Sequence, residues 1–161
     1  PYIFENILRS NLSIALVSFV MAIFMYLAET SKKGFINLSN HNNFNSLLIG
    51  ISQALAIIPG VSRSGITIST GLLSGWERKD AAKFSLMLSI PTIAGAILFS
   101  FLDIRNLETD ISMLTTITGF LTTFIFAYVS IDIFLKVVKS IGYTPFVLYR
   151  MLLGILILWL I

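Results

Sequence analysis

Residues 53–67 read QALAIIPGVSRSGIT and place a polar break between two short apolar runs. The first run covers residues 47–58 and stops at Pro59 and Gly60, and the second covers residues 66–76. Neither run can cross about 30 Å of hydrocarbon at a rise of about 1.5 Å per residue. We therefore predict a re-entrant helical hairpin over residues 47–76, in which protein or a water-filled cavity satisfies the broken backbone. The alternative is one continuous, kinked span.

The composition places the chain in a lipid bilayer. Of its 161 residues, 56% are hydrophobic and 12% are charged, whereas soluble domains carry roughly 25% charged residues. The mean hydropathy is +0.89, so disorder, a coiled coil and a soluble enzyme are all disfavoured. The absence of cysteine excludes disulfide frameworks, cysteine-ligated zinc and iron–sulfur clusters. A net charge of +3 is too small to indicate nucleic acid as a partner.

Four further segments complete an all-α, polytopic membrane bundle in a single domain. We predict spans at residues 11–28, 84–102, 111–135 and 145–161, with Pro91 breaking the second. Three loops are basic, and their cations are Lys32, Lys33, Arg78, Lys79, Lys83, Lys136 and Lys139. Cytoplasmic loops of membrane proteins carry an excess of lysine and arginine. The three basic loops lie on one side of the membrane only if the hairpin enters and leaves on the same face. Charge therefore favours the hairpin and puts the acidic 103–110 loop outside.

The polar break carries the residue types of an anion site. An arginine near the bilayer centre costs about 2.5–3.5 kcal/mol on insertion scales, so Arg63 needs a partner or a function. Its guanidinium fits two phosphate oxygens, and a half-helix that begins near Ser64 offers free N–H groups and a positive dipole end. We predict phosphate or diphosphate as the ligand. The other members of this predicted site are Gly60, Ser62, Ser64, Gly65 and Thr67. In the alternative, Ser62 and Ser64 only cap the half-helix, and Arg63 pairs with a carboxylate from elsewhere.

For the other polar residues we expect either a structural role or one of two alternative roles. Gln53 either hydrogen-bonds to an opposing hairpin or pairs with polar backbone groups of the break. Gln53 and Pro59 are both predicted as possible supports of the site. We expect Trp76 to be an interfacial anchor beside a solvated loop at residues 77–80. Arg150 lies inside an apolar segment, where it snorkels or pairs within the bundle.

The break also resembles a known family. PGVSRSG at residues 59–65, followed by Thr67, is similar to the second signature of the undecaprenyl-diphosphate phosphatases, the bacitracin-resistance membrane proteins. The resemblance continues through GLLSG at 71–75, AAKFSLMLSIPT at 81–92 and Tyr149-Arg150, and it covers nearly the whole chain. Val61 stands where the family usually has a small polar residue. The family's first signature, a glutamate pair and a Ser-Ser-Thr-Gly-His turn, has no match, so we expect the C-terminal part of a longer protein.

The resemblance implies an enzyme of the bacterial inner (plasma) membrane. It would hydrolyse undecaprenyl diphosphate to undecaprenyl phosphate and inorganic phosphate, recycling the lipid carrier of peptidoglycan synthesis and giving bacitracin resistance. Ser62, Arg63 and Ser64 become catalytic candidates, and the diphosphate-binding residues are Gly60, Ser62, Arg63, Ser64, Gly65 and Thr67. The divalent cation, Mg²⁺ or Ca²⁺, is expected on the missing glutamates, so we expect no metal site in this chain and an inactive fragment.

The implied fold is one half of an inverted-repeat architecture. The expected partners are the polyprenyl lipid, the bilayer and the missing N-terminal part of the same protein. Secondary transporters also bind anionic substrates between facing half-helices. A transporter half-domain with its substrate at the hairpin is therefore the alternative function.

Overall fold

The computed structural model describes residues 9–31, 34–104 and 112–160. Its elements are α2 (Asn11–Thr30), α3 (Asn43–Ser52), the 3₁₀ helix η1 (Gln53–Ile57), α4 (Arg63–Leu73), α5 (Arg78–Ile104), α6 (Met113–Ser140) and α7 (Thr144–Trp159). Within these ranges the only β pairing is an isolated bridge between Ile36 and Trp76. The all-α prediction is confirmed, and α2, α5 and α6 are long and apolar enough to cross a membrane.

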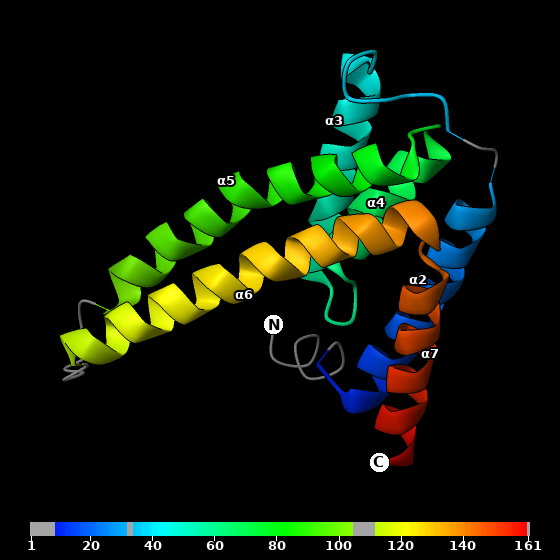
Figure 1. The fold of residues 1–161 in the computed structure, drawn as a ribbon. Helices are drawn as coiled ribbons and strands as arrows, with labels where there is room; N and C mark the ends of the chain where they lie inside the picture. Colours follow the sequence, from blue (N-terminus) through cyan, green and yellow to red (C-terminus); the bar gives the residue numbers. More distant parts are fainter. Residues whose placement is uncertain (1–8, 32–33, 105–111, 161) are drawn as a thin grey trace.

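The helices form a packed group and a projecting pair. Figure 1 shows α2 and α7 side by side, with α3 and α4 next to them, while α5 and α6 run together away from the other helices. The core lies where α2, α4, the start of α5 and the α6–α7 turn meet, and it includes Ala22, Ile49, Ile68, Ala82 and Val138. Most apolar residues of α5 and α6 are exposed, which suits lipid contact.

The segment predicted as a hairpin consists of short helices with a break between them, and not of the continuous, kinked span that was the alternative. Helix α3 and η1 lead down to the break at residues 58–62, and α4 returns against them (Figure 1). The chain cannot continue as a helix because Pro59 lacks an N–H group and Gly60 adopts a φ of +92°. The hairpin begins at Asn43, earlier than the predicted residue 47, because the Asn42 side chain caps α3 by accepting from the Phe44 N–H.

The long helices extend beyond the apolar segments. Helix α5 begins at Arg78, so most of the expected solvated loop at 77–80 is its first turn. The expected break at Pro91 is wrong: α5 continues through this residue to Ile104, since proline removes only one hydrogen bond of the helix. Helix α7 has 16 residues, fewer than the about 20 of a full span, so a crossing at 145–161 stays a prediction.

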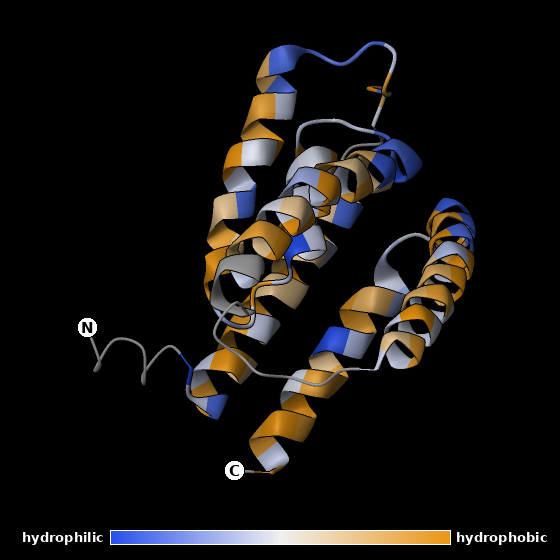
Figure 2. Cartoon of the chain, turned by 90° about the vertical axis from the view of Figure 1, so that its left-hand side faces the viewer, coloured by the Kyte–Doolittle hydropathy of each residue, from blue (hydrophilic) through white to orange (hydrophobic). Residues whose placement is uncertain are grey.

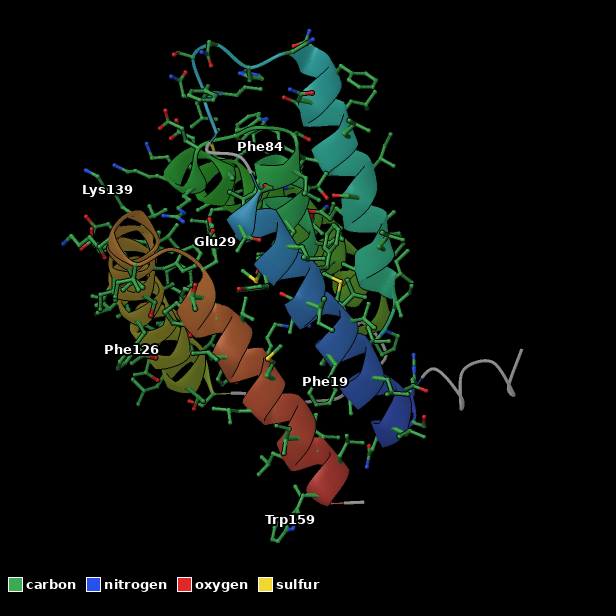
Figure 3. All side chains as sticks on the ribbon, turned by 90° about the vertical axis from the view of Figure 1, so that its right-hand side faces the viewer. Phe19, Glu29, Phe84, Phe126, Lys139 and Trp159 are labelled. Atoms are coloured by element: carbon green, nitrogen blue, oxygen red, sulfur yellow. The ribbon has the colours of Figure 1, made fainter. Side chains whose placement is uncertain are left out.

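Hydrophilic residues gather at one end of the molecule, where α5 begins and α6 ends (Figure 2). Arg78, Lys79 and Lys139 line one cavity of about 320 Å³ there, so two of the predicted basic loops share an end. Figure 3 shows Glu29 and Lys139 at this same end. The described residues do not include Lys32, Lys33 or nearly all of the acidic 103–110 loop. The side of the membrane that each loop faces therefore stays a prediction.

An ion pair and a hydrogen bond join α2, α5 and the α6–α7 turn at this basic end. Glu29 of α2 is 5% exposed and pairs with Arg78 of α5 at 2.5 Å. The hydroxyl of the buried Tyr143, in the α6–α7 turn, donates to the Arg78 carbonyl oxygen at 2.8 Å. Burial and the negative charge of Glu29 raise the pKa of Tyr143 above its ordinary value of 10.0, so the phenol keeps the proton that it donates.

Trp76 belongs to the core and is not an interfacial anchor. It is 1% exposed, and its ring lies 5.0 Å from that of Phe84 and 5.5 Å from that of His41. The bridge from Ile36 carries the preceding loop over this residue. The expectation failed because the sequence places Trp76 next to charges but does not show that the 34–42 loop covers it.

Gly142 provides a test of how the basic end is held together. Its φ is +83°, and a Cβ there would collide with the Glu29 carboxylate. We expect Gly142→Ala to destabilise the protein by about 1–3 kcal/mol and to lower its melting temperature in detergent, measured by circular dichroism. The matched control is Gly119→Ala on α6, where nothing lies within 4 Å and a helical alanine is mildly favourable. Equal melting temperatures for the two variants would contradict this account.

Candidate functional site at the helical break

The break ends in a capped helix N-terminus. Ser62 is the N-cap of α4: its Oγ accepts from the Gly65 N–H at 3.1 Å, and its carbonyl accepts from the Ile66 N–H at 2.9 Å. The capping alternative is therefore correct for Ser62. Capping uses only an acceptor lone pair, however, and leaves the hydroxyl proton for another partner. The N–H groups of Arg63 and Ser64 have no intrahelical acceptor at this end of a helix, so the terminus retains donors for an anion.

A cavity of about 190 Å³ lies beside this terminus. Its polar wall brings together Ser62, Ser64, Gly65 and Arg150. The two serine hydroxyl oxygens are 3.3 Å apart. The other lining residues are Met25, Ile68, Phe134, Phe146 and Tyr149. The cavity therefore combines hydroxyl, backbone and guanidinium donors on one side with apolar and aromatic walls on the other, which is the usual composition of a small-molecule site.

Arg150 is the functional residue that the sequence analysis did not assign to the site. Its Nη2 donates to the Gly60 carbonyl oxygen at 2.7 Å, so α7 holds the break directly. Its Nε is buried without a hydrogen-bond partner among the described residues. Of the two expected behaviours, pairing within the bundle is the one found, although the partner is a backbone carbonyl. The signal was present in the sequence, because an arginine inside an apolar segment marks a functional position by default.

Arg63 lies on the other side of the break. Its half-buried side chain turns toward α5, where Nη1 donates to the Ser89 carbonyl oxygen at 3.5 Å. It does not line the cavity, and no carboxylate pairs with it among the described residues. Asp132 pairs with Lys136 at 2.6 Å. The two arginines thus flank the break, Arg63 from the start of α4 against α5 and Arg150 from α7.

The structure separates the remaining predicted residues from the cavity. Thr67 is 1% exposed, and its Oγ1 lies 2.7 Å from Ser85 Oγ, because the residue sits one helical turn beyond Arg63 and faces α5. Its hydroxyl joins two helices and is not available to a ligand in this arrangement. The close backbone approach at Gly60 is to α2: a Cβ there would lie 2.9 Å from the Ile14 carbonyl oxygen. Gln53 Nε2 donates to Thr92 Oγ1 at 2.9 Å.

The polar groups at the break are donors. No group of three or more His, Cys, Asp or Glu that could hold a metal ion occurs in the part of the chain that the structure describes, and the place of the divalent cation stays a prediction. The buried carboxylate Glu29 is engaged with Arg78 at the basic end. The contacts available to an anion at the break come from hydroxyl, backbone and guanidinium donors.

Gly65 tests the cavity directly. A Cβ at this position would lie 3.0 Å from Ser62 Cβ and 3.3 Å from Arg150 Nη1, so Gly65→Ala must displace the N-cap or the guanidinium. In the full-length protein we expect inorganic pyrophosphate to bind about tenfold more weakly, a loss of about 1.4 kcal/mol, measured by calorimetric titration. Gly50→Ala on α3 has nothing within 4 Å and serves as the control. Unchanged affinity in Gly65→Ala would remove the cavity from consideration.

The part of the chain that is similar to known proteins includes the break and both arginines. Residues 2–156 match the family described as bacitracin resistance protein BacA. The chain is 54% identical over 158 residues to an undecaprenyl-diphosphatase of Prochlorococcus marinus (strain AS9601), with 98% of this chain and 58% of that protein covered. It is 43% identical over 157 residues to an undecaprenyl-diphosphatase of Hahella chejuensis, with coverage of 97% and 59%. A third undecaprenyl-diphosphatase, of Alcanivorax borkumensis, is 38% identical with the same coverage.

The chain spans about three fifths of the length of these curated relatives. The family match includes the capped N-terminus of α4, the cavity beside it and the two flanking arginines. This chain belongs to the bacitracin resistance protein BacA family.

Proposed function

We propose that the protein hydrolyses undecaprenyl diphosphate to undecaprenyl phosphate and inorganic phosphate. The observation that carries the proposal is the cavity at the N-terminus of α4, where Ser62, Ser64 and Arg150 surround a helix end that favours anions. The names of the related proteins support this substrate. The same proposal places the protein in the bacterial plasma membrane, where the reaction regenerates the lipid carrier of the cell wall and confers bacitracin resistance.

The contribution of this chain is charge neutralisation and positioning. Hydrolysis breaks one P–O bond of the diphosphate, joins the oxygen of water to the terminal phosphorus and leaves the other phosphate on the lipid. Such reactions depend mainly on donors that are already in place for the phosphoryl oxygens. The hydroxyls of Ser62 and Ser64 and the Arg150 guanidinium line the cavity. Arg63 reaches the same headgroup by turning from α5 toward the break.

The apolar walls suit the prenyl part of the substrate. Tyr149 lines the phosphate cavity and also an apolar surface groove of about 420 Å³ along α7. The other groove residues are Leu152, Leu153, Ile155, Leu156 and Trp159. A diphosphate held at the break can therefore extend its first isoprene units over α7 without crossing a polar surface.

The remaining catalytic parts are proposed to lie outside this chain. A divalent cation, Mg²⁺ or Ca²⁺, is assigned to acidic residues of the family's first signature, because the described residues offer no ligand set for it. When bound, such an ion would neutralise charge on the diphosphate. The residues described here bind and orient the headgroup beside it.

Arg63→Lys tests the proposed grip on the diphosphate. An ammonium cannot reproduce the two parallel hydrogen bonds of a guanidinium, so we expect phosphate release from a polyprenyl diphosphate to fall at least about tenfold. The assay uses the full-length protein in detergent with Mg²⁺ or Ca²⁺. Lys139→Arg, at the basic end of the molecule, is the matched control. Near-normal release by Arg63→Lys would refute the role given to Arg63.

The isolated 161-residue chain provides a second test. We expect it to release almost no phosphate, because the described part of the chain holds no carboxylate at the break that could bind a cation. The comparison is with the full-length protein, purified in the same detergent and assayed at equal molar concentration. Robust turnover by the isolated chain would show that the site has been assigned incompletely.

A further inference from the structure

Helix α5 presents a polar face to the hairpin. Ser85, Ser89 and Thr92 follow one another at intervals of four and three residues, so they lie on one face of the helix. Each contacts a different hairpin residue: Ser85 Oγ lies 2.7 Å from Thr67 Oγ1, the Ser89 carbonyl accepts from Arg63 at 3.5 Å, and Thr92 Oγ1 accepts from Gln53 at 2.9 Å. Two of these contacts use side-chain hydroxyls, whereas the third uses the backbone carbonyl of Ser89, whose own hydroxyl donates to the Leu86 carbonyl oxygen at 2.6 Å. Polar contacts between membrane helices are typical of functional or packing positions.

The contact between Thr92 and Gln53 fixes the direction of the Gln53 amide. Thr92 Oγ1 donates its single proton to the Leu88 carbonyl oxygen at 2.9 Å. Toward Gln53 the hydroxyl can therefore only accept, and it requires the Nε2 donor of the amide. The Oε1 acceptor is then turned away from Thr92. It is buried and has no hydrogen-bond partner among the described residues.

Arg63 is the candidate donor for this acceptor. Arg63 touches the carbonyl of Ser89, one helical turn from Thr92, and residues at that spacing have Cβ atoms about 5–6 Å apart. The Arg63 contact is long at 3.5 Å, near the limit for a hydrogen bond, and leaves most of the five guanidinium N–H groups free. Gln53 and Arg63 therefore contact α5 at positions within one helical turn of each other.

We propose that Gln53 and Thr92 are positioning residues for Arg63. Thr92 holds the Gln53 amide, and Gln53 Oε1 accepts an N–H of Arg63 when the arginine turns from the Ser89 carbonyl toward the diphosphate. The proposal rests on the proposed function of the break. It assigns the pair a role beyond packing because the Thr67–Ser85 contact already joins α4 to α5, whereas Thr92 is exposed and buries little surface.

Thr92→Val in the full-length protein tests the first step. Valine keeps the shape of threonine but cannot accept from Gln53, so we expect kcat/KM for a polyprenyl diphosphate to fall about tenfold, while Thr92→Ser retains at least about half of the activity. Thr122→Val is the matched control, since Thr122 makes the same bond to its own helix and faces no hairpin residue. Melting temperatures of all variants are measured in the same detergent. Gln53→Met replaces Thr92→Val if the latter does not fold.

A double-mutant cycle separates positioning from packing. If Thr92 acts through Arg63, the double variant Arg63→Lys, Thr92→Val retains the activity of Arg63→Lys alone to within about twofold. Losses that multiply would overturn the proposal, as would full activity in both Thr92→Val and Gln53→Met. Absence of phosphate release from the unmodified full-length protein would overturn the proposed function itself, which distinguishes the two failures.

Discussion

The interrupted backbone at residues 58–62 is the constraint on which this structure depends. If the hairpin enters a bilayer as predicted, lipid offers no hydrogen bonds and the polar groups of the break need partners within the protein. The structure meets this demand with a short turn from Val61 to Ile58, the Ser62 cap on α4, and the Arg150 guanidinium on the Gly60 carbonyl. The groups that satisfy the break are also the groups that we propose to bind the anion. Stability and ligand binding therefore draw on the same few donors, and a change that weakens one affects the other.

The basic end explains why the break can remain open. There Glu29, Arg78 and Tyr143 join α2, α5 and the α6–α7 turn through one ion pair and one hydrogen bond. Glu29 is buried whereas Arg78 is half exposed, so loss of the arginine would leave a buried carboxylate without its partner. Helices α2 and α5 both pack on α4, so the contacts at the basic end also fix elements that adjoin the cavity.

The sequence predicted the parts that follow from local physics and missed those that depend on long-range contact. Pro59, Gly60 and Ser62 carry the signals of a helix end and a helix start, and the hairpin, the capped terminus and the anion-binding chemistry were accessible from them. Thr67 was assigned to the ligand because its spacing allows that role, yet only the position of Ser85 shows which way its hydroxyl faces. Trp76 beside charged residues resembles an interfacial anchor until the 34–42 loop is placed over it. Arg150, 90 residues from Gly60, was recognisable as an unusual charge but not as a partner of the break.

Two arginines on opposite sides of the break make the site suited to a group with charge at two positions. Arg150 is immobilised by the Gly60 carbonyl at 2.7 Å, whereas Arg63 is held by a longer contact of 3.5 Å. A donor that is already bound to the backbone costs little reorganisation when an anion arrives, and a loosely held one can follow a phosphoryl group as its charge develops. Under the proposed function, Arg150 therefore suits the part of the diphosphate that stays on the lipid, and Arg63 suits the phosphate that leaves. Under this division, the contacts of α5 with the hairpin at Ser85, Ser89 and Thr92 lie on the side of the arginine that is held by the longer contact.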